Sequence, residues 1–360
     1  MPCQGGRFCV CLPSSLGSHL SAWRPRRDQL WPPVGASQTG SIDLLSELLD
    51  FTDVARGVAS HQGSDKQHAE GQKADDRSEG PPHAANSIVT RVAPERRVFE
   101  ALGGECEIYA FGIPAGRLAD GESWVHEMHN RLTRFSPTSE LSLFNGSAGS
   151  WADVSPLLES LLRECLRAHE LSGGLVNAAV LPALLAAGYT RTFSEGPTRV
   201  TASVVPPALP EVLEVRPGSA RLRQGASIDL GGIAKGWLAD RLAADLGPNS
   251  LVNLCGDLCA RGGGETGDGW PVGMTGETVL LLDMGAATSG TRKRAWGPDL
   301  HHLIDPRTGL PARSDLTEAS VIARTGADAE IFAKTALLLG STKAAAYLAA
   351  HDALGWSLTP

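Results

Sequence analysis

The stretch ASIDLGGIAKGWLAD at residues 226–240 constrains the fold of this chain more than any other segment. It predicts a strand that ends at Asp229, a Gly231-Gly232 turn, and a helix with Lys235 in its first turns. Because backbone amides and the positive end of the helix dipole gather at such a helix start, the segment favours a bound phosphate. A glycine-rich turn with a solvated lysine explains the same residues, so the segment alone leaves both interpretations open.

A second stretch, LHHLIDPRTGLPA at 300–312, carries two histidines, an aspartate and an arginine on a loop marked by Pro and Gly. Catalytic groups commonly lie on such loops. His302 is a candidate general base or phosphate ligand, and Asp305 is a candidate to orient it or to cap the turn. A surface turn with a capping aspartate is the alternative. Together the two stretches indicate phosphate chemistry on a nucleotide-like substrate.

Composition narrows the class of partner. The chain has 360 residues, and its 32 Lys+Arg against 40 Asp+Glu give a net charge of −8, which argues against nucleic acid as the main partner. No apolar run is long enough to span a bilayer, so we expect no transmembrane segment. The seven cysteines are scattered without a CxxC pair, which argues against a disulfide framework or a structural zinc site. With no convincing signal peptide, a cytoplasmic location is the default expectation.

The chain divides near residue 90. Residues 1–90 are rich in polar residues, Pro and Gly, and we expect a mostly disordered N-terminal extension, with one amphipathic helical stretch at 41–51. Residues 91–360 mix strand meanders with long helices, which favours a single α+β domain with a mixed sheet and flanking helices. Helices are expected at 117–134, 155–174, 233–246, 327–339 and 342–351, with strands at 250–263, 270–274, 278–285 and 316–325. Within the first helix we expect Trp124, His126, Met128 and Leu132 to pack inward, and Ser139 is a candidate N-cap of a short helix.

A further segment, ATSGTRKRAW at 287–296, places the hydroxyls of Thr288 and Ser289 beside a glycine and ahead of three cations. Hydroxyls of this kind often hold phosphate or ribityl groups, and a plain turn explains them equally well.

Seven segments occur in the order found in the ApbE-type flavin transferases, and the chain resembles that family over roughly residues 97–350. The segments are FSPTSELSLFN (135–145), GGLVNAAVLPAL (173–184), IDLGGIAKGWLAD, LVNLCGD, ATSGT, HHLIDPRTGLPA and the terminal helix AEIFAKTALLLG. The resemblance implies an ApbE-like α+β domain and the activity of an FAD:protein FMN transferase. Such enzymes bind FAD with Mg²⁺, attach FMN through a phosphoester to a Thr or Ser of an acceptor flavoprotein, and release AMP. The acceptor carries a Ser/Thr-Gly-Ala-Ser/Thr-type site, and no such segment occurs in this chain.

The resemblance also implies roles for individual residues. Asp229 and Lys235 would hold FAD, the Gly232 carbonyl would face the metal ion, and His302 would act near the attacked phosphorus with Asp305 as its orienter. The pocket for flavin and adenine would be lined by Leu102, Leu175, Val176, Asn177 and Ile304, with Ser139, Thr288 and Ser289 as further cofactor contacts.

Departures from the family pattern concentrate at the metal position. The family has Asp and, four residues on, Thr, whereas this chain has Glu330 and Lys334. A carboxylate can bind a metal ion but an ammonium cannot. Asn177 stands where Asp is usual, and the loop before Ser139 lacks an aromatic that often stacks on FAD.

Two interpretations of the Glu330–Lys334 pair follow. In one, Lys334 replaces part of the metal's electrostatic role in an active transferase, which we favour; in the other, the pair is a plain i,i+4 salt bridge and metal binding is weakened. An FAD pyrophosphatase that yields FMN and AMP, and a non-catalytic FAD-binding protein, are the alternative functions.

Overall fold

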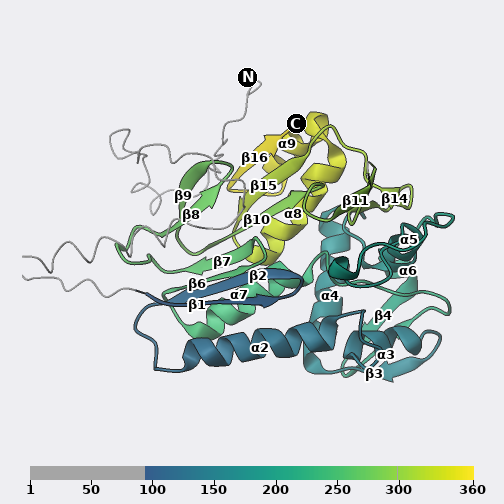
Figure 1. The fold of residues 1–360 in the computed structure, drawn as a ribbon, viewed down its shortest axis with the longest axis horizontal. Helices are drawn as coiled ribbons and strands as arrows, with labels where there is room; N and C mark the ends of the chain where they lie inside the picture. The colour runs from purple at the N-terminus through teal and green to yellow at the C-terminus, as the bar shows by residue number, and fades with distance from the viewer. Residues whose placement is uncertain (1–93, 298) are drawn as a thin grey trace, which may run out of the picture.

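The central element of the fold is a seven-stranded sheet (Figure 1). The computed structural model describes residues 94–297 and 299–360, and the predictions for residues 1–90 lie outside this part of the chain. In order across the sheet, the strands are β1 (Glu95–Ala101), β2 (Gly104–Ala110), β6 (Ser250–Leu254), β7 (Asp257–Arg261), β10 (Met284–Gly290), β15 (Glu318–Ala323) and β16 (Gly355–Thr359). Every strand pair in this sheet is antiparallel, so the α+β class is confirmed while the sheet is not mixed.

Three helices pack on one face of this sheet: α2 (Arg117–Leu132), α7 (Ala234–Leu246) and α8 (Gly326–Leu339). The first turns of α7 and α8 lie backbone to backbone, because a Cβ on Gly236 would stand only 2.3 Å from the Gly326 carbonyl oxygen. Asp240 on α7 accepts hydrogen bonds from the N–H groups of Gly326 (2.7 Å) and Ala327 (2.9 Å) at the start of α8. These contacts fix the start of α8 against α7, beside the Gly-Gly turn.

The opposite face of the sheet is covered by a hairpin of β8 (Trp270–Met274) and β9 (Glu277–Leu281). Trp270 is buried there against Tyr109, Leu251 and Leu258, which project from three strands of the sheet. The two faces therefore carry separate apolar clusters.

Most of the smaller elements lie around α4, at one end of the sheet, and α9 packs against α8 (Figure 1). The helices are α3 (Glu140–Gly146), α4 (Pro156–Leu171), α5 (Leu181–Ala186), α6 (Leu209–Val212), α9 (Ser341–Ala350), and the 3₁₀ turns η2 (Ala178–Val180) and η3 (Phe193–Glu195). The strands are β3 (Trp151–Asp153), β4 (Leu213–Arg216), β5 (Ser219–Leu222), β11 (Ala295–Gly297), β12 (Leu300–His301), β13 (Ile304–Asp305) and β14 (Leu310–Pro311). Among the helices of the described residues, none has the length and apolar character that a membrane span requires.

Four local predictions were wrong. The expected strand 250–263 is the hairpin of β6 and β7, and the expected strand 278–285 is interrupted between the end of β9 and the start of β10. No strand leads into Asp229. The segment before it has no regular secondary structure, and the Asn145 side chain bonds both the N–H (2.8 Å) and the C=O (2.9 Å) of Ile228. An amide side chain thus replaces a neighbouring strand. On α2, Met128 and Leu132 face the core as expected, but His126 is exposed, because Val125 takes the inward position.

Candidate functional site

Lys235 lies at the centre of a buried ion-pair cluster. The Gly231-Gly232 turn places this lysine in the first turn of α7, where its Nζ forms an ion pair with Asp257 at the start of β7. The same Nζ lies 3.2 Å from Glu330 Oε1 on α8. The side chains of Asp257 and Glu330 are 5% and 2% exposed, so two buried carboxylates share one ammonium.

Glu330 also binds the backbone of α7. Its Oε2 accepts a 2.9 Å hydrogen bond from the Gly236 N–H. Burial alone would raise the pKa of this carboxyl, but Lys235, Lys334 and the Gly236 N–H together hold it below its usual value. Glu330 is therefore ionised. It occupies the Gly236 N–H, one of the backbone amides at the start of α7 that we expected to bind phosphate.

Lys334 reaches the same turn from α8. Its Nζ donates a hydrogen bond to the Gly232 carbonyl oxygen and lies 3.6 Å from Glu330 Oε1. Burial lowers the pKa of Lys334 to about 8, while Glu330 acts in the opposite direction, so the group is mainly protonated at neutral pH. The i,i+4 spacing of Glu330 and Lys334 on one helix face thus directs both side chains at the Gly-Gly turn.

Asp229 binds a residue that the sequence analysis did not select. Its Oδ2 lies 2.9 Å from Nε of Arg134, whose side chain is only 6% exposed, and its Oδ1 accepts a 2.9 Å hydrogen bond from the Gly231 N–H. The Asp229 N–H donates to the Ala178 carbonyl at 2.8 Å, which brings the loop of Asn177 beside the turn. Asn177 itself caps η2 through its Oδ1 and donates from Nδ2 to the Pro207 carbonyl.

Aromatic rings surround Arg134. Its guanidinium lies 4.2 Å from the ring centroid of Phe135 and 4.6 Å from that of Tyr189, and its Nη2 donates to the Tyr189 carbonyl. Tyr189 in turn stands 5.4 Å from the ring of Trp296. Three segments far apart in sequence thus form a cluster of aromatic side chains beside Arg134. Phe135 opens the FSPTSELSLFN segment, but its partners could not be found from spacing.

His302 lies under the influence of both lysines. Its Nδ1 is buried and has no hydrogen-bond partner among the described residues, whereas its backbone N–H donates to the Arg294 carbonyl at 3.2 Å. Burial, followed by the positive charges of Arg294 and Lys334 and smaller contributions from His301 and Lys235, holds the pKa of His302 well below its usual value. The ring is therefore neutral at pH 7 with a nitrogen available to a ligand.

The expectation that Asp305 orients His302 was wrong. Both carboxylate oxygens of Asp305 bind Arg307, and Oδ1 also accepts from the Arg307 N–H. The Asp305 carbonyl accepts from the N–H groups of Thr308 and Gly309. Asp305 therefore stabilises the local turn, which agrees with the alternative interpretation of this loop as a surface turn with a capping aspartate. His301 is likewise structural, with its Nε2 3.0 Å from the Ala312 carbonyl oxygen.

The other residues predicted to contact the cofactor lie in different surroundings. Leu102 adopts a positive φ of 54°, and its carbonyl accepts from Nη2 of Arg294, which places it near the double-histidine loop. Ser139 caps α3 as predicted and is held by the Thr133 carbonyl, so its hydroxyl serves the helix. Leu175, Val176 and Ile304 are buried in apolar clusters.

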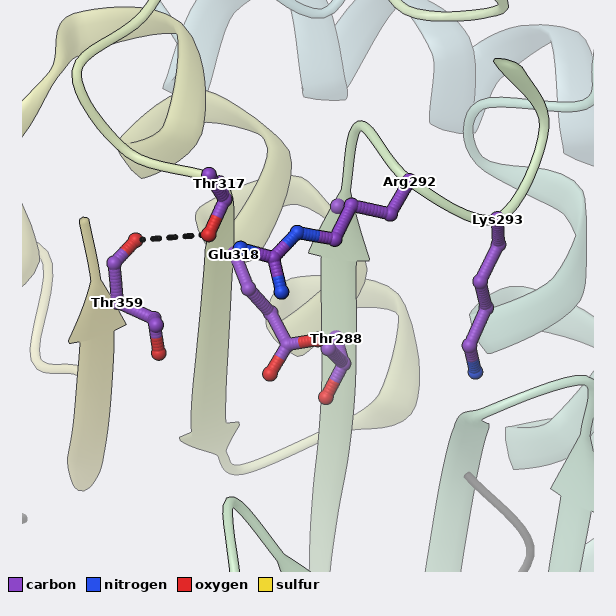
Figure 2. Close-up of a pocket in the computed structure, with 7 residues that line it drawn as sticks. Thr288, Arg292, Lys293, Thr317, Glu318 and Thr359 are labelled. Atoms are coloured by element: carbon purple, nitrogen blue, oxygen red, sulfur yellow. Dashed lines mark hydrogen bonds between the residues drawn. The ribbon is translucent and has the colours of Figure 1, made fainter. Parts of the chain in front are cut away.

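Thr288 and Ser289 point to opposite faces of β10. Ala287 pairs with Asp257 across the sheet, so Ser289 shares the face of Lys235, whereas Thr288 lies on the other face and pairs its hydroxyl with Ser320 at 2.8 Å. Figure 2 shows Thr288 in a separate depression with Arg292, Lys293 and Glu318. The structure therefore does not bring Thr288 to the Gly-Gly turn.

The predicted metal position was Gly232, Glu330 and Lys334. These groups do not fit a divalent cation, because the Gly232 carbonyl faces an ammonium and Glu330 is bound by two lysines and an amide. Within the described ranges, no group of three or more His, Cys, Asp or Glu side chains could hold a metal ion.

The fold and the site define an α+β domain with two buried lysines at a Gly-Gly turn and a buried, neutral histidine that feels their charge. The chain belongs to the ApbE family, whose profile matches residues 102–355.

Named relatives support the same assignment. An FAD:protein FMN transferase of Treponema pallidum is 32% identical over 246 residues, which are 58% of this chain and 67% of that protein. The Salmonella typhimurium protein of the same name is 25% identical over 299 residues, covering 71% of this chain and 82% of the relative.

Solved structures show the same fold. The ApbE protein of Thermotoga maritima superposes with a TM-score of 0.66 at 21% identity, covering 74% of this chain and 94% of that one. The apo flavinyl transferase ApbE of Pseudomonas stutzeri gives a TM-score of 0.65 at 20% identity, with coverages of 74% and 95%.

Proposed function

We propose that this protein is an FAD:protein FMN transferase, which attaches FMN from FAD to a Ser or Thr of an acceptor flavoprotein and releases AMP. Membership of the ApbE family and the names of the relatives support the proposal. The observation that carries it is the neutral His302, whose buried Nδ1 has no hydrogen-bond partner in the part of the chain that the structure describes and whose ring lies in the field of Lys235 and Lys334. Such an arrangement suits a diphosphate bound between the turn and the double-histidine loop.

In the proposed reaction the acceptor hydroxyl oxygen attacks the phosphorus of the FMN half of FAD. The new phosphoester bond forms while the bond from that phosphorus to the bridging oxygen breaks, and AMP leaves with the bridging oxygen. The hydroxyl proton passes to Nδ1 of His302. A base with a lowered pKa is weak on its own, but the negative diphosphate beside it raises that pKa and makes proton transfer easier.

The lysines act on the charge of the phosphates. Lys235 and Lys334 are fixed by Asp257 and Glu330 before FAD arrives, so they need little rearrangement as charge moves onto the departing AMP. Preorganised cations of this kind are a major source of rate enhancement in phosphoryl transfer.

A polar pair and three aromatic rings beside the turn hold the substrate. Asp229 and Arg134 form one polar pair beside the turn. Phe135 and Tyr189 lie against Arg134, and Trp296 lies beside Tyr189. Rings of this kind stack on planar heterocycles. They supply a surface for the flavin or adenine of FAD.

An incubation of the full chain with FAD, Mg²⁺ and an acceptor flavoprotein bearing a Ser/Thr-Gly-Ala-Ser/Thr-type site tests the proposal. We expect the intact mass of the acceptor to rise by one FMN unit, and an acceptor with that Ser or Thr changed to Ala to stay unmodified. AMP and free FMN formed without acceptor would identify a pyrophosphatase. Stoichiometric FAD in the purified protein with no AMP would identify a non-catalytic binder.

The acceptor sequence and the cytoplasmic location stay predictions. The Mg²⁺ requirement implied by the resemblance is not part of the proposal, because the Gly232 carbonyl accepts a hydrogen bond from the Lys334 ammonium and Glu330 is bound by two lysines and an amide.

A further inference from the structure

The two lysines and two carboxylates at the Gly-Gly turn form a set balanced in charge. Lys235 and Lys334 carry positive charge, Asp257 and Glu330 carry negative charge, and all four side chains are at most 16% exposed. A divalent cation at the turn would lie close to both ammonium groups, and the two carboxylates are already paired with these lysines. Repulsion between like charges is strong where water is scarce, so the lysines oppose such an ion.

The space at the Gly-Gly turn is also too small for a divalent cation. A Cβ built on Gly232 would stand 2.9 Å from Nζ of Lys334, so the ammonium lies directly against the turn. The carbonyl oxygen of Gly232 accepts the hydrogen bond of this ammonium. Mg²⁺ would need to lie about 2.1 Å from such an oxygen, a place that the ammonium already blocks.

Lys334 also retains donor capacity. An ammonium has three N–H donors, and its contacts with Gly232 and Glu330 occupy two of them among the described residues. At least one N–H is left for an oxygen of a ligand. The side chain can therefore link the turn to a phosphate, as a bridging cation would.

We propose that the Lys334 ammonium takes the position and the electrostatic role of a divalent cation in this site, so that FAD binds to this chain without a metal ion. The inference rests on the proposed function for its ligand. It makes Lys334 a substrate-binding residue, and Glu330 the group that positions it.

The first experiment needs no variant. FAD is titrated into the full chain, and binding is measured from the change in flavin fluorescence, once with EDTA and once with excess Mg²⁺. We expect dissociation constants that agree within about twofold. In parallel, Mg²⁺ is titrated into the FAD-free protein by calorimetry, where we expect no heat of binding.

The second experiment restores oxygen donors. The Lys334→Thr variant and the double variant Glu330→Asp/Lys334→Thr are titrated with FAD in the same two buffers. We expect FAD binding to weaken at least tenfold in EDTA and to recover in Mg²⁺ for one or both variants. Lys343→Thr removes an exposed lysine of α9 and should behave as the parent chain.

The outcomes separate the two claims. FAD binding by the parent chain only in Mg²⁺ would overturn the role of Lys334 and leave the proposed function intact. Variants that bind FAD like the parent chain in EDTA, or that lose binding in both buffers, would also overturn it. A parent chain that binds FAD in neither buffer would refute the proposed function, and the inference with it.

Discussion

Glu330 Oε2 accepts a 2.9 Å hydrogen bond from the Gly236 N–H, so helix α8 supplies an anion to the first turn of helix α7. Asp240 of α7 returns the contact by accepting from Gly326 and Ala327 at the start of α8. Each helix thus satisfies amides of the other, and the lysines of both are held at the Gly-Gly turn. The geometry of the site therefore depends on the packing of these two helices.

Glu330→Gln should destabilise the folded chain by about 3–5 kcal/mol, because it removes a buried charge and leaves two lysines without part of their partner. The free energy of unfolding from denaturant titration measures the change. Glu277→Gln alters an exposed residue of β9 and should stay within about 0.5 kcal/mol of the parent chain. Equal effects of the two substitutions would contradict the role given to Glu330.

Arg134→Lys should weaken FAD binding about tenfold, since lysine keeps the charge but loses the planar fork that binds Asp229 and Tyr189 together. Titration with FAD measures the dissociation constant. Arg199→Lys, at an exposed position, is the matched control. If both variants bind FAD as the parent does, Arg134 has no part in the site.

His302→Ala should retain FAD binding and lose FMN transfer by about 10²–10⁴-fold, the usual contribution of a general base. Single-turnover transfer to an acceptor, followed by intact mass, separates the chemical step from binding. The exposed His126→Ala is the control and should transfer at the parent rate. A His302→Ala variant with normal transfer would show that another group accepts the proton.

Protonation of His302 should also be visible in stability. The pKa of this ring is below its unfolded value, so at a pH between the two values the unfolded chain binds one more proton than the folded chain. Stability from this group is complete above the unfolded pKa of about 6.5 and is lost as the pH falls below it, by at most about 1.4 kcal/mol per pH unit.

Comparison of the parent chain with His302→Asn isolates this effect, because burial also lowers the pKa values of His129, His169 and His301. Free energies of unfolding measured from about pH 5 to 7.5 should fall less steeply with acid in the variant. Parallel curves would mean that His302 is not held neutral by the fold.

Sequence patterns predicted the parts of the site that depend on local signals. Helix periodicity and the Gly231-Gly232 pair located α7 and placed Lys235 in its first turn, and Ser139 was recognisable as a cap. These features are set by residues a few positions apart.

What could not be predicted depends on contacts between distant segments. Asn145 replaces a strand partner of Ile228 from 83 residues away, and Arg134 meets Asp229 only in the folded chain. The prediction for Asp305 was wrong for the opposite reason. Asp305 was expected to orient His302, but it forms local hydrogen bonds to Arg307 instead. The position of Lys334 was evident from the sequence, but not its hydrogen bond to Gly232.

The most direct test of the account is the ratio of AMP released to FMN attached, measured in one incubation of protein, FAD and acceptor by chromatography and intact mass. The account predicts one AMP for each FMN-modified acceptor, with AMP formation dependent on the acceptor hydroxyl. AMP in large excess over attached FMN, or AMP formed equally well with an acceptor lacking that hydroxyl, would contradict it.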